Sequence, residues 1–371
     1  MKKMLLILKW LILIALVVAA AVFLFLNFHP VFGGKPDQAG LERIRNSPNF
    51  NGTEFVNIEQ TVIATRDDNP SWLDWTIKML NPPPGKRPAK PLPTVPLNVS
   101  ELKHGSIAWL GHATTLMQMG GKRVITDPVF YRASPVPFTV EPFAMSHTPQ
   151  IAELPALDAV LISHDHYDHL DYRAIRELNG KTARFIVPLG VKAHLQKWGV
   201  ADEKITELDW DETAQLDDIA VTLVPSRHFS GRTMGGRNHT LWGGYVIKGA
   251  GLSLYFSGDS GYGTHYKERI ARYAPFDLVL MESGAYDEGW SQIHSFPEQS
   301  VQAVLDLGAN RTMPVHWGKF DLANHTWTDG INRFTKAAEE NGITAATPKI
   351  GQVFNISDET LPQEKWWKAA E

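Results

Sequence analysis

The sequence predicts an α/β domain in which helices cover the outer faces of packed β-sheets, preceded by an N-terminal apolar helix. Three observations support this class. Short β-type runs recur from residue 105 onward, helical segments alternate with them, and the first 30 residues are largely apolar. The chain has 371 residues, which is enough to bury the core of one large domain.

The expected strands are runs of β-branched and aromatic residues that are separated by turns rich in glycine. The first three follow one another closely, which predicts a meander. Strands are expected over 106–110, 114–119, 122–127, 157–163, 183–188, 219–226, 241–247, 252–258, 276–283 and 311–316.

Helices are expected between these strands, where apolar residues recur at helical spacing. The helix at 296–307 should begin with a capping box, because Glu298 follows Ser295 by three residues. The expected helices are 171–179, 190–198, 264–273, 296–307 and 329–341, with a short amphipathic helix at 70–80.

The N-terminal segment 10–28 carries no charged side chain. About 19 residues at about 1.5 Å each cover about 28 Å, close to the thickness of a bilayer core. A cleaved signal peptide, cut near the alanines at 19–21, is the alternative, but the apolar run continues beyond them. Because Lys2, Lys3 and Lys9 precede the span, we expect the N-terminus in the cytoplasm and the domain outside it, on the periplasmic side in a Gram-negative cell.

The amino-acid composition excludes several kinds of functional site. The chain has no cysteine, which excludes disulfides, thiolate metal ligands and cysteine nucleophiles. Any metal must therefore be held by nitrogen and oxygen. The net charge of −4 gives no indication of nucleic-acid binding.

The motif LISHDHYDHLD at residues 161–171 places three histidines and three aspartates directly behind an apolar run. A packed core could not hold these side chains unpaired. In an extended or turning segment His164 and His166 point the same way, so they can share one metal ion. Asp168 and His169 lie beyond them and can reach a second ion.

Three further residues of ligand type each follow another expected strand, namely His228, Asp259 and His316. Strand ends can aim side chains rigidly into one cleft. We therefore expect His228 to complete the first metal site and His316 the second, while the two oxygens of Asp259 bridge both. Such ligands suit two divalent ions, with Zn²⁺ preferred and Mn²⁺ or Fe²⁺ as alternatives, and the ions can hold a hydroxide between them.

These seven residues resemble the metal motif of the metallo-β-lactamase-fold superfamily. The resemblance implies a four-layer αββα sandwich with a dinuclear site at one edge, between its two halves. It also implies that Asp127, in the stretch ITDP, orients the metal-binding segment.

A narrower resemblance covers roughly residues 100–335 and points to the subgroup that contains N-acyl-phosphatidylethanolamine-hydrolysing phospholipase D. A histidine of that subgroup, which lies near the metals and helps catalysis, matches His294, although Ser295 and Phe296 depart from the pattern. His112 belongs to the pattern and is expected to support the site without binding a metal. The similar stretches are WLGHAT (109–114), TDPVF (126–130), SRHFSGR (226–232), LWGGYVI (241–247), FSGDSGY (256–262), GAYDEGW (284–290) and VHWGKFDLANH (315–325).

The resemblance implies a dinuclear metal hydrolase of phospholipase D type, which the N-terminal apolar segment is expected to anchor to a membrane. Its expected reaction converts N-acyl-phosphatidylethanolamine to phosphatidic acid and N-acylethanolamine, with Asp168 and His294 as catalytic residues. Two alternatives stay open: a metal-dependent lactonase or ester hydrolase on the same fold, and a metal-binding envelope protein without turnover. Sharing Asp259 leaves each ion room for hydroxide, which favours an enzyme because structural zinc sites are closed.

The expected organisation is a membrane anchor at 1–30, an irregular proline-rich strap at 31–100 that packs on the domain, and the hydrolase domain at 101–371. The expected partners are a lipid or small-molecule ester substrate and a membrane. The sequence leaves the oligomeric state open, a homodimer included.

Other histidines carry less information. His104, His147, His194 and His265 belong to no motif and are expected at the surface. His239 and His325 are expected either beside the cleft or at the surface, and Tyr167 either positions substrate or packs.

Overall fold

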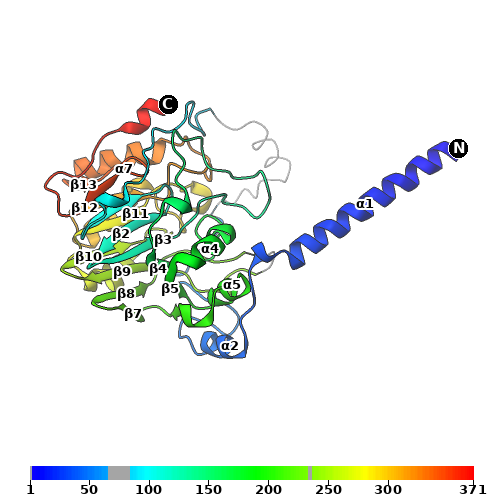
Figure 1. The fold of residues 1–371 in the computed structure, drawn as a ribbon, viewed down its shortest axis with the longest axis horizontal. Helices are drawn as coiled ribbons and strands as arrows, with labels where there is room; N and C mark the ends of the chain where they lie inside the picture. Colours follow the sequence, from blue (N-terminus) through cyan, green and yellow to red (C-terminus); the bar gives the residue numbers. More distant parts are fainter. Residues whose placement is uncertain (1, 66–83, 233–235) are drawn as a thin grey trace.

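The computed structural model describes residues 2–65, 84–232 and 236–371. Within these residues two seven-stranded mixed sheets pack face to face, and helices cover their outer faces (Figure 1). This arrangement confirms the predicted αββα sandwich with an apolar helix in front of it. The helix expected at 70–80 lies outside the described residues.

The first sheet contains the predicted meander. Gly120 and Gly121 form its two-residue turn at φ 50° and 82°, a conformation that glycine adopts without strain. The strands are β1 (Ser106–Trp109), β2 (Thr115–Met119), β3 (Lys122–Thr126), β4 (Leu157–Leu161), β5 (Thr182–Pro188), β6 (Ile205–Leu208) and β14 (Val353–Asn355). Their order is β14-β1-β2-β3-β4-β5-β6, antiparallel from β14 to β3 and parallel from β3 to β6.

The second sheet combines antiparallel and parallel pairing in the same way. Its strands are β7 (Thr213–Leu216), β8 (Ile219–Val224), β9 (Gly244–Gly249), β10 (Leu252–Phe256), β11 (Leu278–Glu282), β12 (Arg311–Val315) and β13 (Thr344–Ala345). Their order is β13-β12-β11-β10-β9-β8-β7, antiparallel from β7 to β10 and parallel from β10 to β13.

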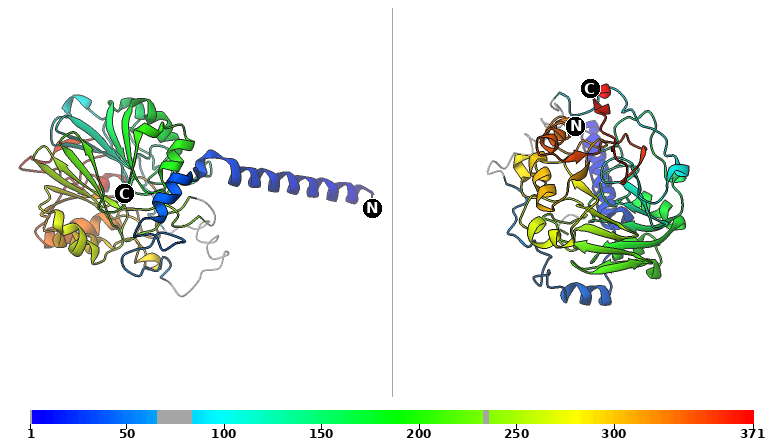
Figure 2. Two further views of the ribbon diagram at one scale, coloured as in Figure 1. Left: turned by 90° about the horizontal axis from the view of Figure 1, so that it is seen from below. Right: turned by 90° about the vertical axis from the view of Figure 1, so that its left-hand side faces the viewer.

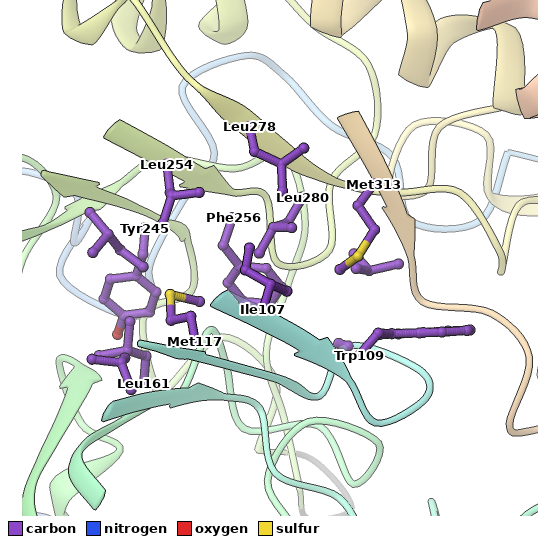
Figure 3. Close-up of a cluster of buried hydrophobic side chains, with 14 of the residues drawn as sticks. Ile107, Trp109, Met117, Leu161, Tyr245, Leu254, Phe256, Leu278, Leu280 and Met313 are labelled. Carbon is purple, nitrogen blue, oxygen red and sulfur yellow. The ribbon is translucent and has the colours of Figure 1, made fainter. Parts of the chain in front are cut away.

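The main core lies between the two sheets, because successive side chains of a strand point to opposite faces. Met117 and Leu161 of the first sheet meet Tyr245, Phe256 and Leu280 of the second in one buried cluster (Figure 3). This central layer fixes the two sheets relative to each other, and the ends of the loops at their shared edge are fixed with them.

Two outer cores complete the four layers. The helices α4 (Tyr172–Leu178) and α5 (Lys192–Lys197) pack Ile175 and Leu195 on the outer face of the first sheet. The helices α6 (Pro297–Asp306) and α7 (Asp329–Glu340) pack Val304 and Phe334 on the outer face of the second (Figure 2).

Several local expectations differ from the structure. The residue before α6 is Phe296, whose N–H donates to Oε1 of Gln299 at 3.1 Å, so the Ser295–Glu298 capping box was wrong. The segment expected as one helix at 264–273 forms two short turns, Tyr266–Ile270 and Ala271–Tyr273. The helix α2 (Gln38–Arg45) and the strands β6, β7, β13 and β14 were not predicted.

The N-terminal helix α1 (Lys2–Phe28) projects from the domain as a single rod, and none of its residues is buried (Figure 2). It is long and apolar enough to cross a membrane, a test that a signal sequence near the N-terminus also passes. The following turn, Pro30–Phe32, joins the domain, where the indole N–H of Trp198 donates to the Pro30 carbonyl at 2.6 Å.

Candidate metal centre

The metal loop, residues 162–171, connects β4 to α4. The loop ends where Asp171 caps α4, since its Oδ1 accepts hydrogen bonds from the N–H groups of Arg173 and Ala174 at 2.9 and 3.2 Å. Its Oδ2 accepts from the N–H groups of Phe130 and Tyr131. The third aspartate of the motif therefore shapes the loop, which leaves the histidines and Asp168 to face inward.

Three imidazole rings converge at the first of two candidate metal positions. His166 Nδ1 lies 2.8 Å from His164 Nε2 and 3.2 Å from His228 Nε2. Burial holds the pKa of His164 and of His228 well below the usual value, and the pKa of His166 is lowered as well. These rings are therefore neutral, and a neutral imidazole nitrogen is a metal ligand.

Two histidines and one aspartate form the second candidate metal position. His316 Nε2 lies 3.1 Å from His169 Nε2 and 3.2 Å from Asp168 Oδ2, and the distance between His169 Nε2 and Asp168 Oδ2 is 3.4 Å. The structure thus brings these three side chains together from the metal loop and from the residue after β12.

Asp259 lies between the two positions. Its Oδ2 is 3.1 Å from Nε2 of both His169 and His316, and 3.8 and 3.7 Å from Nε2 of His164 and His228. Its Oδ1 is buried and has no hydrogen-bond partner among the described residues. A buried carboxylate oxygen without a partner is costly unless a cation or water satisfies it.

The electrostatics favour cations at this place. Burial opposes protonation of His316, yet Asp259 and Asp168 raise its pKa to about 10, and they raise the pKa of His169 well above its usual value. The carboxylates thus stabilise positive charge inside a buried pocket. Seven nitrogen and oxygen donors with one shared carboxylate fit two divalent metal ions.

Asp127 supports the metal loop, as the resemblance implied. It is fully buried, and its Oδ1 accepts from the N–H of Ser163 at 2.7 Å. Its Oδ2 accepts from Ser163 Oγ at 2.6 Å and faces His169 Nδ1 at 2.7 Å. This contact fixes the ring of His169 so that Nε2 points at the metal position.

His112 holds the opposite side of the second position. Its Nε2 lies 3.1 Å from Asp168 Oδ2, and its carbonyl accepts from the N–H of His316 at 3.0 Å. His112 and His316 both adopt the left-handed region, at φ 56° and 68°. Residues other than glycine rarely hold this conformation unless surrounding contacts stabilise it.

His294 lies beside the metal ligands, with ring centroids 5.0 Å from His228 and 5.4 Å from His316. Its Nδ1 is 2.9 Å from Oε2 of Glu282, a fully buried carboxylate at the end of β11. Sequence reasoning missed Glu282. The available signal was its place at the end of an apolar strand, the same signal that identified Asp259 and His316.

Two histidines expected at the surface are buried, so that expectation was wrong. His194 lies on the inner face of α5, where its Nε2 is 3.3 Å from Asp165 Oδ2 and its Nδ1 accepts from the N–H of Gly34 at 3.0 Å. His265 is buried, with Nε2 3.1 Å from Ser260 Oγ.

The remaining histidines and Tyr167 lie either at the surface or in contact with other side chains. His104 and His239 are exposed, and His147 is half-buried. His325 lines a pocket together with His112 and His316, while Tyr167 packs against Arg232 and donates to its carbonyl.

Arg232 connects the metal loop to the segment that follows α1. Its buried guanidinium donates to the carbonyls of Asp165 and Leu170 at 2.6 and 2.8 Å, and to the carbonyl of Val31 at 3.1 Å. Together with the contacts of His194, this places the base of α1 directly against the metal loop.

Comparisons with known proteins agree with this geometry. The family model described as "Beta-lactamase superfamily domain" matches residues 122–317. An uncharacterized protein of Mycobacterium tuberculosis is 41% identical over 344 residues, which cover 90% of this chain and 91% of the relative. N-acyl-phosphatidylethanolamine-hydrolyzing phospholipase D 1 of Caenorhabditis elegans is 30% identical over 268 residues, which cover 67% of this chain and 75% of the relative.

A solved structure has the same fold. Igni18, a metallo hydrolase from the archaeon Ignicoccus hospitalis, superposes with a TM-score of 0.51 at 19% identity, covering 67% of this chain and 97% of that one.

Proposed function

We propose that this chain, which belongs to the beta-lactamase superfamily, is a membrane-anchored dinuclear metal hydrolase that cleaves the phosphodiester of N-acyl-phosphatidylethanolamine. The observation that carries the metal chemistry is the position of Asp259, whose Oδ2 lies within 3.8 Å of four imidazole nitrogens. The similarity to the phospholipase D of Caenorhabditis elegans supports the substrate class.

The ligand sets follow from the distances. His164, His166 and His228 would hold one ion, Asp168, His169 and His316 the other, and Asp259 both. When bound, two divalent ions, with Zn²⁺ preferred, supply Lewis acidity that activates water and neutralises charge on the phosphoryl oxygens. The chain's own contribution is to hold these donors rigidly in a water-poor pocket.

His294 is the residue placed to move a proton. In their 2.9 Å contact Oε2 of Glu282 would accept from Nδ1 of His294, which would leave Nε2 to face the substrate. In the doubly protonated ring Nε2 would donate a hydrogen bond to a phosphoryl oxygen or a proton to the leaving alkoxide, while Nδ1 keeps its contact with Glu282.

The anchoring proposal rests on α1. Its apolar residues are all outside the core, and Phe25 in its last turn contacts Phe32 of the following turn at a ring separation of 5.3 Å. With the lysines before the span, the catalytic domain would lie outside the cytoplasm. The metal centre would then lie next to a lipid substrate.

A hydrolase of small esters or lactones is the second candidate, and one observation favours it. The described pocket beside His112 and His316 has a volume of about 20 Å³ and is lined in part by Phe143 and Trp327. This volume holds about one water molecule, so the pocket leaves no room for the acyl chains of a lipid beside these two histidines.

The test is a turnover assay of the purified full chain on N-acyl-phosphatidylethanolamine, with products identified by mass spectrometry. Lactones and bis-nitrophenyl phosphate are assayed in parallel, and Asp168→Ala serves as the inactive control. Release of N-acylethanolamine and phosphatidic acid supports the proposal. Turnover of lactones alone would assign the chain to the second candidate, and metal binding without any turnover would refute the enzyme.

A further inference from the structure

A cavity of about 600 Å³ lies at the foot of α1, and no step of the proposed reaction uses it. Its wall combines Phe25 and His29 of the N-terminal segment with Tyr167 of the metal loop. Three arginines, Arg132, Arg173 and Arg176, also line it. We propose that this cavity binds the phosphate headgroup of an anionic phospholipid from the membrane that holds α1.

The charge of the cavity is the first argument. Arg132 makes no hydrogen bond or ion pair with any described residue, and Arg176 donates only to the hydroxyl of Tyr172, at 3.2 Å. Arg173 uses its Nε for Glu177 at 2.9 Å, and its terminal nitrogens form no hydrogen bond within the described chain. Guanidinium groups with free donors are suited to bidentate binding of phosphate.

The acidic residues of the cavity do not cancel this charge. Asp171 is buried, and its two oxygens accept from four backbone N–H groups. Glu177 is engaged by Arg173 and by the hydroxyl of Tyr131, at 2.6 Å. The fourth arginine of the wall, Arg232, is committed to backbone carbonyls. Arg132 and Arg176 therefore remain uncompensated in a chain whose net charge is −4.

The position of the cavity is the second argument. The wall residue His29 follows the last residue of α1 directly and contacts Tyr172 of α4, with ring centroids 6.3 Å apart. A helix that spans a bilayer carries its end to the headgroup level, so a cavity formed by that end opens where lipid phosphates lie.

An exposed apolar loop next to the cavity is the third argument. Pro135 and Pro137 line the cavity, and the intervening and following residues, Val136 and Phe138, are 47% and 92% exposed. A nearly fully exposed phenylalanine beside a membrane helix fits insertion among acyl chains. The headgroup would then occupy the cavity while its chains lie alongside α1.

The inference rests on the proposed anchoring, and its test needs no turnover. The full chain is purified in detergent with equimolar phosphatidylglycerol and phosphatidylcholine, and the retained lipid is measured by native mass spectrometry. We expect one retained phosphatidylglycerol and no retained phosphatidylcholine. The variant Arg132→Gln/Arg176→Gln should bind phosphatidylglycerol about 30-fold more weakly, since each basic residue near a membrane surface contributes about fivefold.

A matched control removes two positive charges elsewhere. Arg45→Gln/Lys368→Gln changes two exposed residues outside the cavity and should retain phosphatidylglycerol like the wild type. His169→Ala should do the same, which separates the cavity from the metal centre.

Three outcomes would overturn the inference. They are equal retention of the two lipids, unchanged retention in Arg132→Gln/Arg176→Gln, and binding of inorganic phosphate without retention of phosphatidylglycerol. A chain that retains phosphatidylglycerol but hydrolyses no phosphodiester contradicts only the proposed function, and active protein that retains no anionic lipid contradicts only this inference.

Discussion

Asp127→Asn tests how the buried carboxylate controls the metal centre. The substitution keeps the shape of the side chain, and asparagine tolerates the positive φ of 36° at this position. An amide, however, presents one oxygen and one NH₂ group, whereas Asp127 accepts from the Ser163 N–H on one oxygen and faces Ser163 Oγ and His169 Nδ1 with the other. In either orientation of the amide, its NH₂ group therefore faces another hydrogen-bond donor.

The result depends on the tautomer of His169. If the NH₂ group faces Nδ1, that nitrogen must accept, and the proton moves to Nε2, the atom 3.1 Å from Asp259 Oδ2. A protonated Nε2 cannot bind a metal. If the amide is turned round, His169 keeps its proton on Nδ1, but the NH₂ group then faces the Ser163 N–H. One buried donor is left unsatisfied, at a cost of about 1–3 kcal/mol. We therefore expect one of the two ions to bind about 10–100-fold more weakly.

The measurement is metal content by mass spectrometry after dialysis against buffers of graded chelator strength. Asp158→Asn is the matched control, because Asp158 is a partly exposed carboxylate that pairs with Lys122 away from the metal centre. Loss of one ion of two at intermediate chelator strength agrees with the reasoning. Unchanged affinity for both ions, with ¹⁵N NMR showing the proton still on His169 Nδ1, would refute it.

Asp168→Ala and His169→Ala should each lower turnover at least about 100-fold while far-UV circular dichroism stays native, because each removes a donor of the second position; full activity with intact metal content in either variant would exclude that residue as a ligand. Gly284→Ala should destabilise the fold by about 1–3 kcal/mol and release the second ion, since the new Cβ would lie 1.8 Å from the His316 carbonyl oxygen; a denaturation midpoint equal to wild type would contradict this. Burial lowers the pKa of Lys319 from 10.5 to about 7, so between these values the unfolded chain binds more protons and the wild-type free energy of unfolding should rise with pH, by up to about 1.4 kcal/mol per unit. Lys319→Met should lack this rise between pH 7.5 and 9.5 in denaturant titrations, and parallel curves for the two proteins would show that the lysine is not the cause.

Ten strands of the two central layers were predictable, because neighbouring layers cover most of their side chains and these side chains are mainly apolar. β4 (LDAVL) and β11 (LVLME) each contain one acidic residue in an otherwise apolar run, a pattern that indicates a buried strand. All four edge strands were missed. β6 and β7 have four residues each. β13 and β14 contain only two and three residues and owe their pairing to neighbours far along the chain. Local pattern carries no signal for a strand of that length.

The candidate ligands were predictable for a different reason. His164, His166, Asp168 and His169 stand together in the sequence, and strand ends identified the others. His194 was misjudged because a single histidine that belongs to no motif carries no local sign of burial. Only the docking of α5 against the metal loop places it beside Asp165.

The sequence by itself determined which side chains could bind metal, since donor type and local spacing are properties of the chain. The tertiary structure decided what surrounds them: Glu282 behind His294, Arg232 between the metal loop and Val31, and the arginine-lined cavity at the foot of α1. Those contacts join residues far apart in the chain. They exist only because packing the two sheets brings the chain's distant loops to one edge, and no local pattern encodes such a meeting.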